Sequence, residues 1–180
     1  MSLVFCFLLT APLASQNNYE KESRIEMHEV PSKARSFIDS CFIKNVKWYS
    51  VENQDGESIK AKAKLGGHLY CIGFDSSGCI QDVNKKIKFK SFDPLIRKKI
   101  KTSLKSNFKS YRIKNTQIQW RATNPTLQSL VKTGNAESKY SIRFDLLIKS
   151  RINGPKRYFK VLFDDKGKLE SINEIRDKAI

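Results

Sequence analysis

The chain contains little of what catalytic and metal sites are made from. Its 180 residues include two histidines and four cysteines, and no two cysteines stand in a CxxC pair. Structural zinc sites take Cys or His ligands at short spacings, so we expect no metal. GxSxG, HExxH, GxGxxG and P-loop motifs are also absent from the sequence. We therefore predict a protein that is not an enzyme and has no cofactor.

The sequence has no long apolar run. We interpret a short apolar run near its start as part of an export signal. Residues 3–9 are apolar but too few to span a bilayer. Leu13, Ala14 and Ser15 follow, and small residues there suit a signal peptidase. We predict that residues 1–15 are a cleaved signal peptide, that residues 16–28 are a flexible tail, and that the mature protein is periplasmic or secreted. The alternative is a buried N-terminal strand, because no Lys or Arg precedes the run.

Cysteine usage gives no sign of a disulfide framework. Removal of residues 1–15 would leave three cysteines, an odd number that cannot be fully paired within one chain. Cys71 and Cys79 lie on the two arms of a predicted hairpin but not opposite each other, so disulfide geometry does not fit. Cys41 lies on the apolar stripe of a predicted helix, a poor place for a nucleophile. We interpret all three as small apolar residues.

Acidic residues are scarce relative to basic ones. The chain has 34 Lys and Arg against 18 Asp and Glu, a formal net charge of +16, which favours an anionic partner. Residues 85–121 alone contain thirteen Lys or Arg and one acid, Asp93. A charge run of this kind is often a solvated helix face, and the alternative is a surface for an anionic ligand.

Hydrophobic periodicity predicts helices and strands in alternating groups. Pro31 opens a first helix, and Asp93 with Pro94 opens a second. The first helix carries an apolar stripe at Ala34, Phe37, Ile38, Cys41 and Phe42. Strands are predicted at residues 46–53, 59–65, 70–74, 79–84, 111–121, 140–148 and 159–163, with a last one ending at 172. We place both tryptophans, Trp48 and Trp120, in the core.

The phrase Phe-Asp-x-x-Gly occurs twice, at residues 74–78 and 163–167, with a constant offset of 89. Asp can accept backbone N–H bonds and Gly can adopt positive φ, so the phrase marks a turn. The helix starts Pro31 and Pro94 differ by only 63, so the second copy is 26 residues longer. We assign the excess to an inserted loop at residues 122–138 and a longer hairpin. The prediction is an α+β tandem repeat of helix plus antiparallel sheet, at residues 29–88 and 89–180, with the helices packed on one sheet face.

These helix starts resemble the PepSY-like family of exported Bacteroidetes proteins, also described as β-lactamase-inhibitor-protein-like (BLIP-like). The matching positions are Val30, Pro31, Ala34, Phe37, Ile38 and Phe42, and then Phe92, Asp93, Pro94, Ile96 and Ile100. The resemblance covers residues 30–175 and implies tandem helix-plus-sheet units and a binding role, without implying inhibition of a β-lactamase. The chain departs from the family in having no proline soon after the first helix, a long segment after Trp120 and a more basic composition. These departures concern the partner more than the fold.

Two candidate binding surfaces follow from the strand and helix patterns. If the helices cover one face of the sheet, the other face is open. Strand alternation assigns to this open face Lys60, Lys62, Lys64, Arg143, Lys149, Tyr158 and Lys160. The second candidate is a basic patch on the second helix, made of Arg97, Lys98, Lys101 and Lys105.

Three functions remain open at this point. The first is an exported, non-catalytic binding or inhibitor-like protein that recognises a protein or peptide through the open sheet face. The second is a basic binder of nucleic acid or of anionic envelope glycan or lipid through residues 85–121. Nucleic acid is the less expected of these partners, because export would separate the protein from genomic DNA. The third is an enzyme of unrecognised type.

Overall fold

The computed structural model describes residues 20–53, 56–151 and 155–175, which form nine strands and three α-helices. The strands are β1 (Glu20–Ile25), β2 (Lys47–Asn53), β3 (Gly56–Leu65), β4 (His68–Asp75), β5 (Ile80–Lys86), β6 (Tyr111–Arg121), β7 (Ser141–Arg151), β8 (Lys156–Asp164) and β9 (Leu169–Ile175). The helices are α1 (Ser32–Ser40), α2 (Pro94–Asn107) and α3 (Asn124–Thr133), with the short 3-10 helices η1 (Met27–Glu29) and η2 (Phe89–Ser91) before α1 and α2. No helix in these described ranges is long and apolar enough to cross a membrane.

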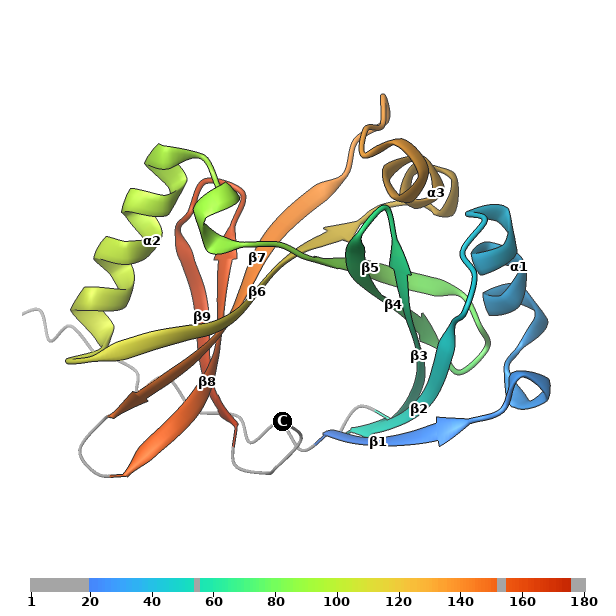
Figure 1. Ribbon diagram of the computed structural model, residues 1–180, viewed down its shortest axis with the longest axis horizontal. Helices are drawn as coiled ribbons and strands as arrows, with labels where there is room; N and C mark the ends of the chain where they lie inside the picture. The colour runs from blue at the N-terminus through green and yellow to red at the C-terminus, as the bar shows by residue number, and fades with distance from the viewer. Residues whose placement is uncertain (1–19, 54–55, 152–154, 176–180) are drawn as a thin grey trace, which may run out of the picture.

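All nine strands form one antiparallel sheet in which each strand pairs with its neighbours in sequence, from β1 to β9. The sheet curves strongly, and Figure 1 shows α1, α2 and α3 on its convex side. We call the opposite, helix-free side the concave face. This arrangement confirms the prediction of an α+β fold with helices on one sheet face.

Two hydrophobic cores lie between the helices and the sheet. Phe74 is part of the first, with residues of α1 and of β2 to β5, and Phe163 is part of the second, with residues of α2, β7 and β8. Both phenylalanine rings are fully buried. Trp48 and Trp120 are buried in the first core, which confirms that they are core residues. One continuous sheet therefore carries two cores, and Trp120, from the second predicted repeat, lies in the first of them.

The repeated phrase forms the same turn in both halves. In the first half, the Asp75 N–H donates to the Cys79 carbonyl oxygen (2.9 Å), and the Gly78 N–H donates to the Asp75 carbonyl oxygen (3.0 Å). The equivalent bonds donated by Asp164 and Gly167 measure 2.9 and 3.1 Å. The prediction that the phrase marks a turn is confirmed.

Each turn glycine also packs against the start of a helix. Gly78 and Gly167 adopt φ values of 82° and 77°, which favour glycine. A Cβ at Gly78 would lie 2.7 Å from the Pro31 Cβ, and one at Gly167 would lie 3.2 Å from the Ile96 carbonyl oxygen. The phrase is therefore the point at which the sheet of each half meets its helix.

The prediction of a flexible tail at residues 16–28 is wrong for its described part. Residues 20–25 form β1, the edge strand paired with β2, and η1 follows. The strand was not predicted because its composition is polar. Its charged side chains are instead paired with other strands, since the Glu22 carboxylate forms ion pairs with Lys60 and Lys62 of β3. Ile25 packs against the first core. Residues 1–19, including the predicted signal peptide, lie outside the described residues.

The prediction of a loop at residues 122–138 is also wrong, because the segment contains α3. Pro125 stands in the first turn of this helix, and Gly134 ends it with a φ of 79°. Between them, Leu127, Leu130 and Val131 are spaced at i, i+3 and i+4 and are buried. They pack into the first core, although the second half of the chain supplies them. The insertion thus ties the second half to the first.

The apolar stripe of α1 ends one residue earlier than predicted. The helix stops at Ser40, Cys41 is buried as expected, and Phe42 has a φ of 56°. This left-handed conformation turns Phe42 outward, where its side chain is 77% exposed. The Lys132 ammonium of α3 lies 5.3 Å from the centre of its ring.

Candidate functional site

The sheet register places all seven predicted open-face residues on the concave face. On β3, for example, Ile59, Ala61 and Ala63 are buried in the first core, so the residues between them point the other way. The seven are Lys60, Lys62, Lys64, Arg143, Lys149, Tyr158 and Lys160. Each is half-buried or exposed. Their common face is settled by the register, and their role in binding stays a prediction.

The floor of the concave face is a row of hydrogen-bonded polar side chains that sequence reasoning missed. The Asp82 carboxylate accepts bonds from Asn84 Nδ2 (2.7 Å) and from Gln119 Nε2 (3.0 Å). One strand further on, the Asp145 carboxylate accepts a bond from Gln117 Nε2 (3.1 Å). Paired groups of this kind hold a half-buried polar floor rigid. The signal was available, because these residues alternate with buried apolar ones along β5, β6 and β7.

Charges from distant strands meet across this face. Five strand spacings separate β3 from β8, which would place Lys60 and Lys160 about 24 Å apart in a flat sheet, well beyond the range of screened charges. In the curved sheet, Lys160 acts on both Lys60 and Asp82, and its ammonium lies 3.4 Å from the Asp145 carboxylate. Curvature therefore converts one face of a sheet into a single electrostatic site.

Burial shifts the protonation equilibria at the centre of the face. Desolvation raises the pKa of Asp82, while Arg121, Lys160 and Lys60 act in the opposite direction. Desolvation likewise lowers the pKa of Lys60. Gly73 lies between them in the register. The Cys71 thiol stands two residues earlier on the same strand, and its pKa is raised mainly by burial. A thiol with a raised pKa is a weak nucleophile at neutral pH.

Two tyrosines lie on opposite flanks of the face, and each has a lysine over its ring. The Lys62 ammonium of β3 is 4.5 Å from the ring centre of Tyr49 on β2. The Lys149 ammonium of β7 is 5.1 Å from the ring centre of Tyr158 on β8. Tyr49 was not among the predicted site residues. Its pairing with Lys60 places it on the concave face, and the sequence alone did not give the register between β2 and β3.

The face is basic even after its ion pairs are counted. Glu22 pairs with Lys60 (3.4 Å) and Lys62, and the Arg143 Nε lies 2.8 Å from the Glu170 carboxylate. Arg121 pairs with Asp82 and Lys160 with Asp145. The remaining cations that the register assigns to this face include Arg24, Lys64, Lys86, Arg112 and Lys149. Cations outnumber carboxylates, so the field over the hollow is positive.

The basic stretch at residues 85–121 does not form one surface. Lys86, Arg112 and Arg121 contribute to the concave face. Lys85 points to the helix side, with its ammonium 5.6 Å from the Tyr70 ring centre. The predicted patch of Arg97, Lys98, Lys101 and Lys105 lies on the outward side of α2, on the convex side of the sheet. Sheet alternation and helix geometry thus split the charge between two sides of the molecule.

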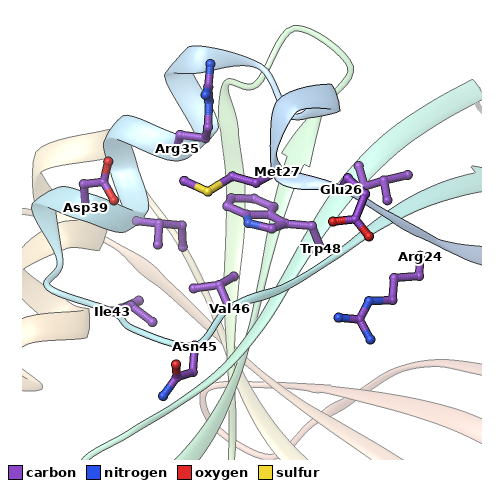
Figure 2. A pocket seen from close by; sticks show the side chains of 11 residues that line it. Arg24, Glu26, Met27, Arg35, Asp39, Ile43, Asn45, Val46 and Trp48 are labelled. Carbon is purple, nitrogen blue, oxygen red and sulfur yellow. The ribbon is translucent and has the colours of Figure 1, made fainter.

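A small pocket of about 230 Å³ opens between β1, α1 and β2. Figure 2 shows the Trp48 ring beside Met27, with Asp39 on one side and Arg24 and Glu26 on the other. The pocket is smaller than the roughly 300–1,000 Å³ of ordinary small-molecule sites. Among the described residues no group of three or more His, Cys, Asp or Glu side chains could hold a metal ion.

The pH dependence of stability tests the buried charge on Asp82. Because its pKa is raised in the folded state, this carboxyl stabilises the fold when protonated, below the unfolded value of about 3.9, and that contribution is lost as pH rises through the folded value. Asp82→Asn stays neutral at every pH. We expect the unfolding free energy of the variant, minus that of the wild type, to increase between about pH 4 and pH 7 in urea titrations.

Asp75→Asn is the matched control with the opposite sign. The Ser77 hydroxyl bond and the Cys79 N–H bond lower the pKa of Asp75, so its contribution is present above the unfolded value and lost in acid. The same difference should therefore fall as pH rises in acid, up to about pH 5, and stay flat from there to pH 7. A flat profile for Asp82→Asn would show that the Asp82 charge is well solvated.

Two solved structures share this fold. One is a BLIP-like protein from Bacteroides fragilis, with a TM-score of 0.52 and 12% sequence identity over 83% of this chain and 92% of that chain. Another is a DUF2874 family protein from Bacteroides ovatus, with a TM-score of 0.55 and 11% identity over 84% of this chain and 94% of that chain. No family model and no curated protein matches the sequence. The likeness shows the fold and confirms the BLIP-like architecture that the sequence resemblance predicted.

Proposed function

We propose that this chain is an exported, non-catalytic binding protein that holds an acidic segment of a partner protein or peptide on its concave face. The observation that supports this most is the set of cations that the sheet register places on this face, from Lys60 on β3 to Lys149 and Lys160 on β7 and β8. It means that a segment lying in the hollow would feel cations from both flanks at once. A hollow basic face attracts an anionic partner and fixes its orientation.

The make-up of the face favours a peptide over a nucleic acid. Tyr49 and Tyr158 have lysine ammonium groups over their rings, which leaves less ring surface for stacked bases. The side-chain amides in the floor, by contrast, are of the kind that hydrogen-bond a peptide backbone. A BLIP-like fold in the two solved structures is consistent with a binding role.

Export is part of the proposal and rests on the sequence alone. Residues 3–15 have the apolar run and the small residues of a signal peptide. Export would place the concave face in the periplasm or outside the cell. The absence of recognised catalytic motifs supports a role in binding, and inhibition of an enzyme would be one use of such binding.

A charge-reversal pair tests the concave face. Lys64 and Lys149 lie on opposite flanks of the concave face. Replacing each lysine with glutamate reverses its charge without breaking an ion pair of the floor. A displayed library of random peptides should yield Asp- and Glu-rich sequences with the wild type. Lys64→Glu/Lys149→Glu should weaken binding of those peptides by at least about tenfold, because attraction becomes repulsion. Isothermal titration would measure the change.

Lys98→Glu/Lys105→Glu is the matched control, since it changes the net charge equally but on the convex side. It should leave peptide affinity within about twofold, because the exposed charges of α2 act on the far side of the sheet. Equal losses in the two variants would mean that binding follows net charge and not the concave face. A library without acidic enrichment would contradict the proposed partner.

A further inference from the structure

The outward side of α2 is a second basic surface, separate from the concave face. No Asp or Glu occurs between Pro94 and Asn107. A shallow depression of about 370 Å³ runs along the helix and is lined by Pro94, Arg97, Lys98, Lys101, Thr102 and Lys105. Lys98, Lys101 and Lys105 are exposed, and none of them makes an ion pair or hydrogen bond within the described part of the chain. In this they differ from the paired lysines Lys60, Lys62 and Lys160.

This surface is unfavourable for the helix itself. Arg97, Lys101 and Lys105 follow one another at i+4 spacing, where like charges destabilise a helix by about 0.2–0.5 kcal/mol per pair. The two helix starts, Pro31 and Pro94, are 63 residues apart. At this spacing Arg97 and Lys101 correspond to Ala34 and Ile38 of α1, and both of these are buried. The side of α1 that carries Ala34 and Ile38 is therefore buried, whereas the corresponding side of α2 carries basic residues.

The surface reaches beyond the helix. The Arg97 guanidinium donates a 2.7 Å hydrogen bond to the Lys90 carbonyl oxygen, which holds η2 and its exposed Lys90 beside α2. Leu95 lies on the outward side as well, one turn before Lys98 and Lys99, and is 71% exposed. A large apolar side chain among unpaired lysines is typical of helices that lie in a membrane interface.

We infer that α2 docks this protein onto an anionic membrane surface, with the lysines at the lipid phosphates and Leu95 inserted between headgroups. Charge complementarity argues for the phosphates. Exposed Leu95 argues for a lipid surface over a dissolved polyanion, which would not bury it. Figure 1 shows α2 outside the arch, so a docked molecule would leave its concave face open to solvent. The inference does not depend on the proposed peptide binding.

Vesicle flotation with the full chain tests this inference. Neutral phosphatidylcholine vesicles measure any contribution of the apolar residues 3–9, and vesicles that also contain phosphatidylglycerol measure the electrostatic part. The wild type should bind the anionic vesicles and dissociate at high salt. Lys98→Gln/Lys101→Gln/Lys105→Gln should weaken that partitioning on the order of 100-fold, since each lysine near an anionic bilayer contributes about fivefold.

The matched control removes three exposed lysines remote from α2, in Lys44→Gln/Lys47→Gln/Lys139→Gln. Partitioning of this variant should stay close to that of the wild type. Leu95→Ser should reduce binding to anionic vesicles by roughly tenfold and leave binding to heparin unchanged, because only a bilayer buries leucine. Circular dichroism checks that each variant is folded.

Three results would overturn the inference. They are equal losses in the two triple variants, no preference of the wild type for anionic vesicles, and tight binding of duplex DNA without binding of anionic vesicles. None of them bears on the Lys64→Glu/Lys149→Glu experiment, so the two proposals fail separately.

Discussion

Gly78→Ala should lower the free energy of unfolding by about 2–5 kcal/mol, through two causes that add. The φ of 82° is a left-handed conformation that costs an alanine about 1–2 kcal/mol. The new Cβ would also lie 2.7 Å from the Pro31 Cβ and 3.0 Å from the Ala34 backbone nitrogen. Neither neighbour is the end of a flexible side chain, so the turn or α1 must shift, at a further cost of about 1–3 kcal/mol.

Gly134→Ala separates the two causes. Gly134 has nearly the same φ, 79°, but no atom lies within 4 Å of its added Cβ. This variant should lose only about 1–2 kcal/mol. Gly167→Ala, with a Cβ 3.2 Å from the Ile96 carbonyl oxygen, should fall between the other two. Chemical denaturation would give all three values, and equal losses at Gly78 and Gly134 would contradict the close contact between the first turn and α1.

Phe74→Ala should be the most destabilising single truncation in the first core, with a loss of about 3–5 kcal/mol. The ring is fully buried and contacts Phe37 edge-on at 5.8 Å and Trp48 at 6.0 Å between centroids. Phe163 occupies the equivalent place in the second half, equally buried but without an aromatic partner among the described residues. Each lost ring contact costs about 0.5–1.5 kcal/mol, and Phe163 has two fewer, so Phe163→Ala should lose about 1–3 kcal/mol less.

The same pair of variants reports whether the two halves unfold together. Trp48 and Trp120 both lie in the first core, so tryptophan fluorescence follows that half, while circular dichroism follows the whole sheet. The two halves share one continuous sheet, and α3 of the second half packs into the first core. We therefore expect the halves to unfold cooperatively. Phe163→Ala should therefore shift the fluorescence midpoint as well. An unchanged fluorescence midpoint beside a lower dichroism midpoint would show independent unfolding.

Most of the fold was predictable because its signals are local. Strand alternation and helix spacing depend on neighbouring residues, and β6 was predicted at residues 111–121, its observed bounds. The two errors concern segments that are stabilised from a distance. β1 is held by Lys60 and Lys62, about forty residues further on, and α3 is held by a core built from the first half. β1 shows no apolar alternation within itself, whereas α3 does carry a helical pattern in Leu127, Leu130 and Val131, flanked by a proline and a glycine that are equally typical of a loop.

The candidate site was predictable as a list of side chains but not as a place. Alternation assigned Lys60 and Lys160 to the same face, yet four strands lie between β3 and β8 in the sheet order. Their coupling depends on curvature, which no short stretch of sequence encodes. For the same reason, Asp82 and Asp145 did not stand out, since an Asp on an exposed strand face is ordinary until the strands beside it are known.

The simple order of the strands has a consequence for folding kinetics. Because β1 to β9 pair only with their neighbours along the chain, the sheet needs no pairing between strands that are remote in sequence. Contacts between nearby residues close short loops, and proteins rich in them fold faster than proteins with crossed strand orders. A growing chain could add each hairpin to the edge of the last one as it leaves the ribosome. The late arrival of α3 would then complete the first core only after β6 is in place.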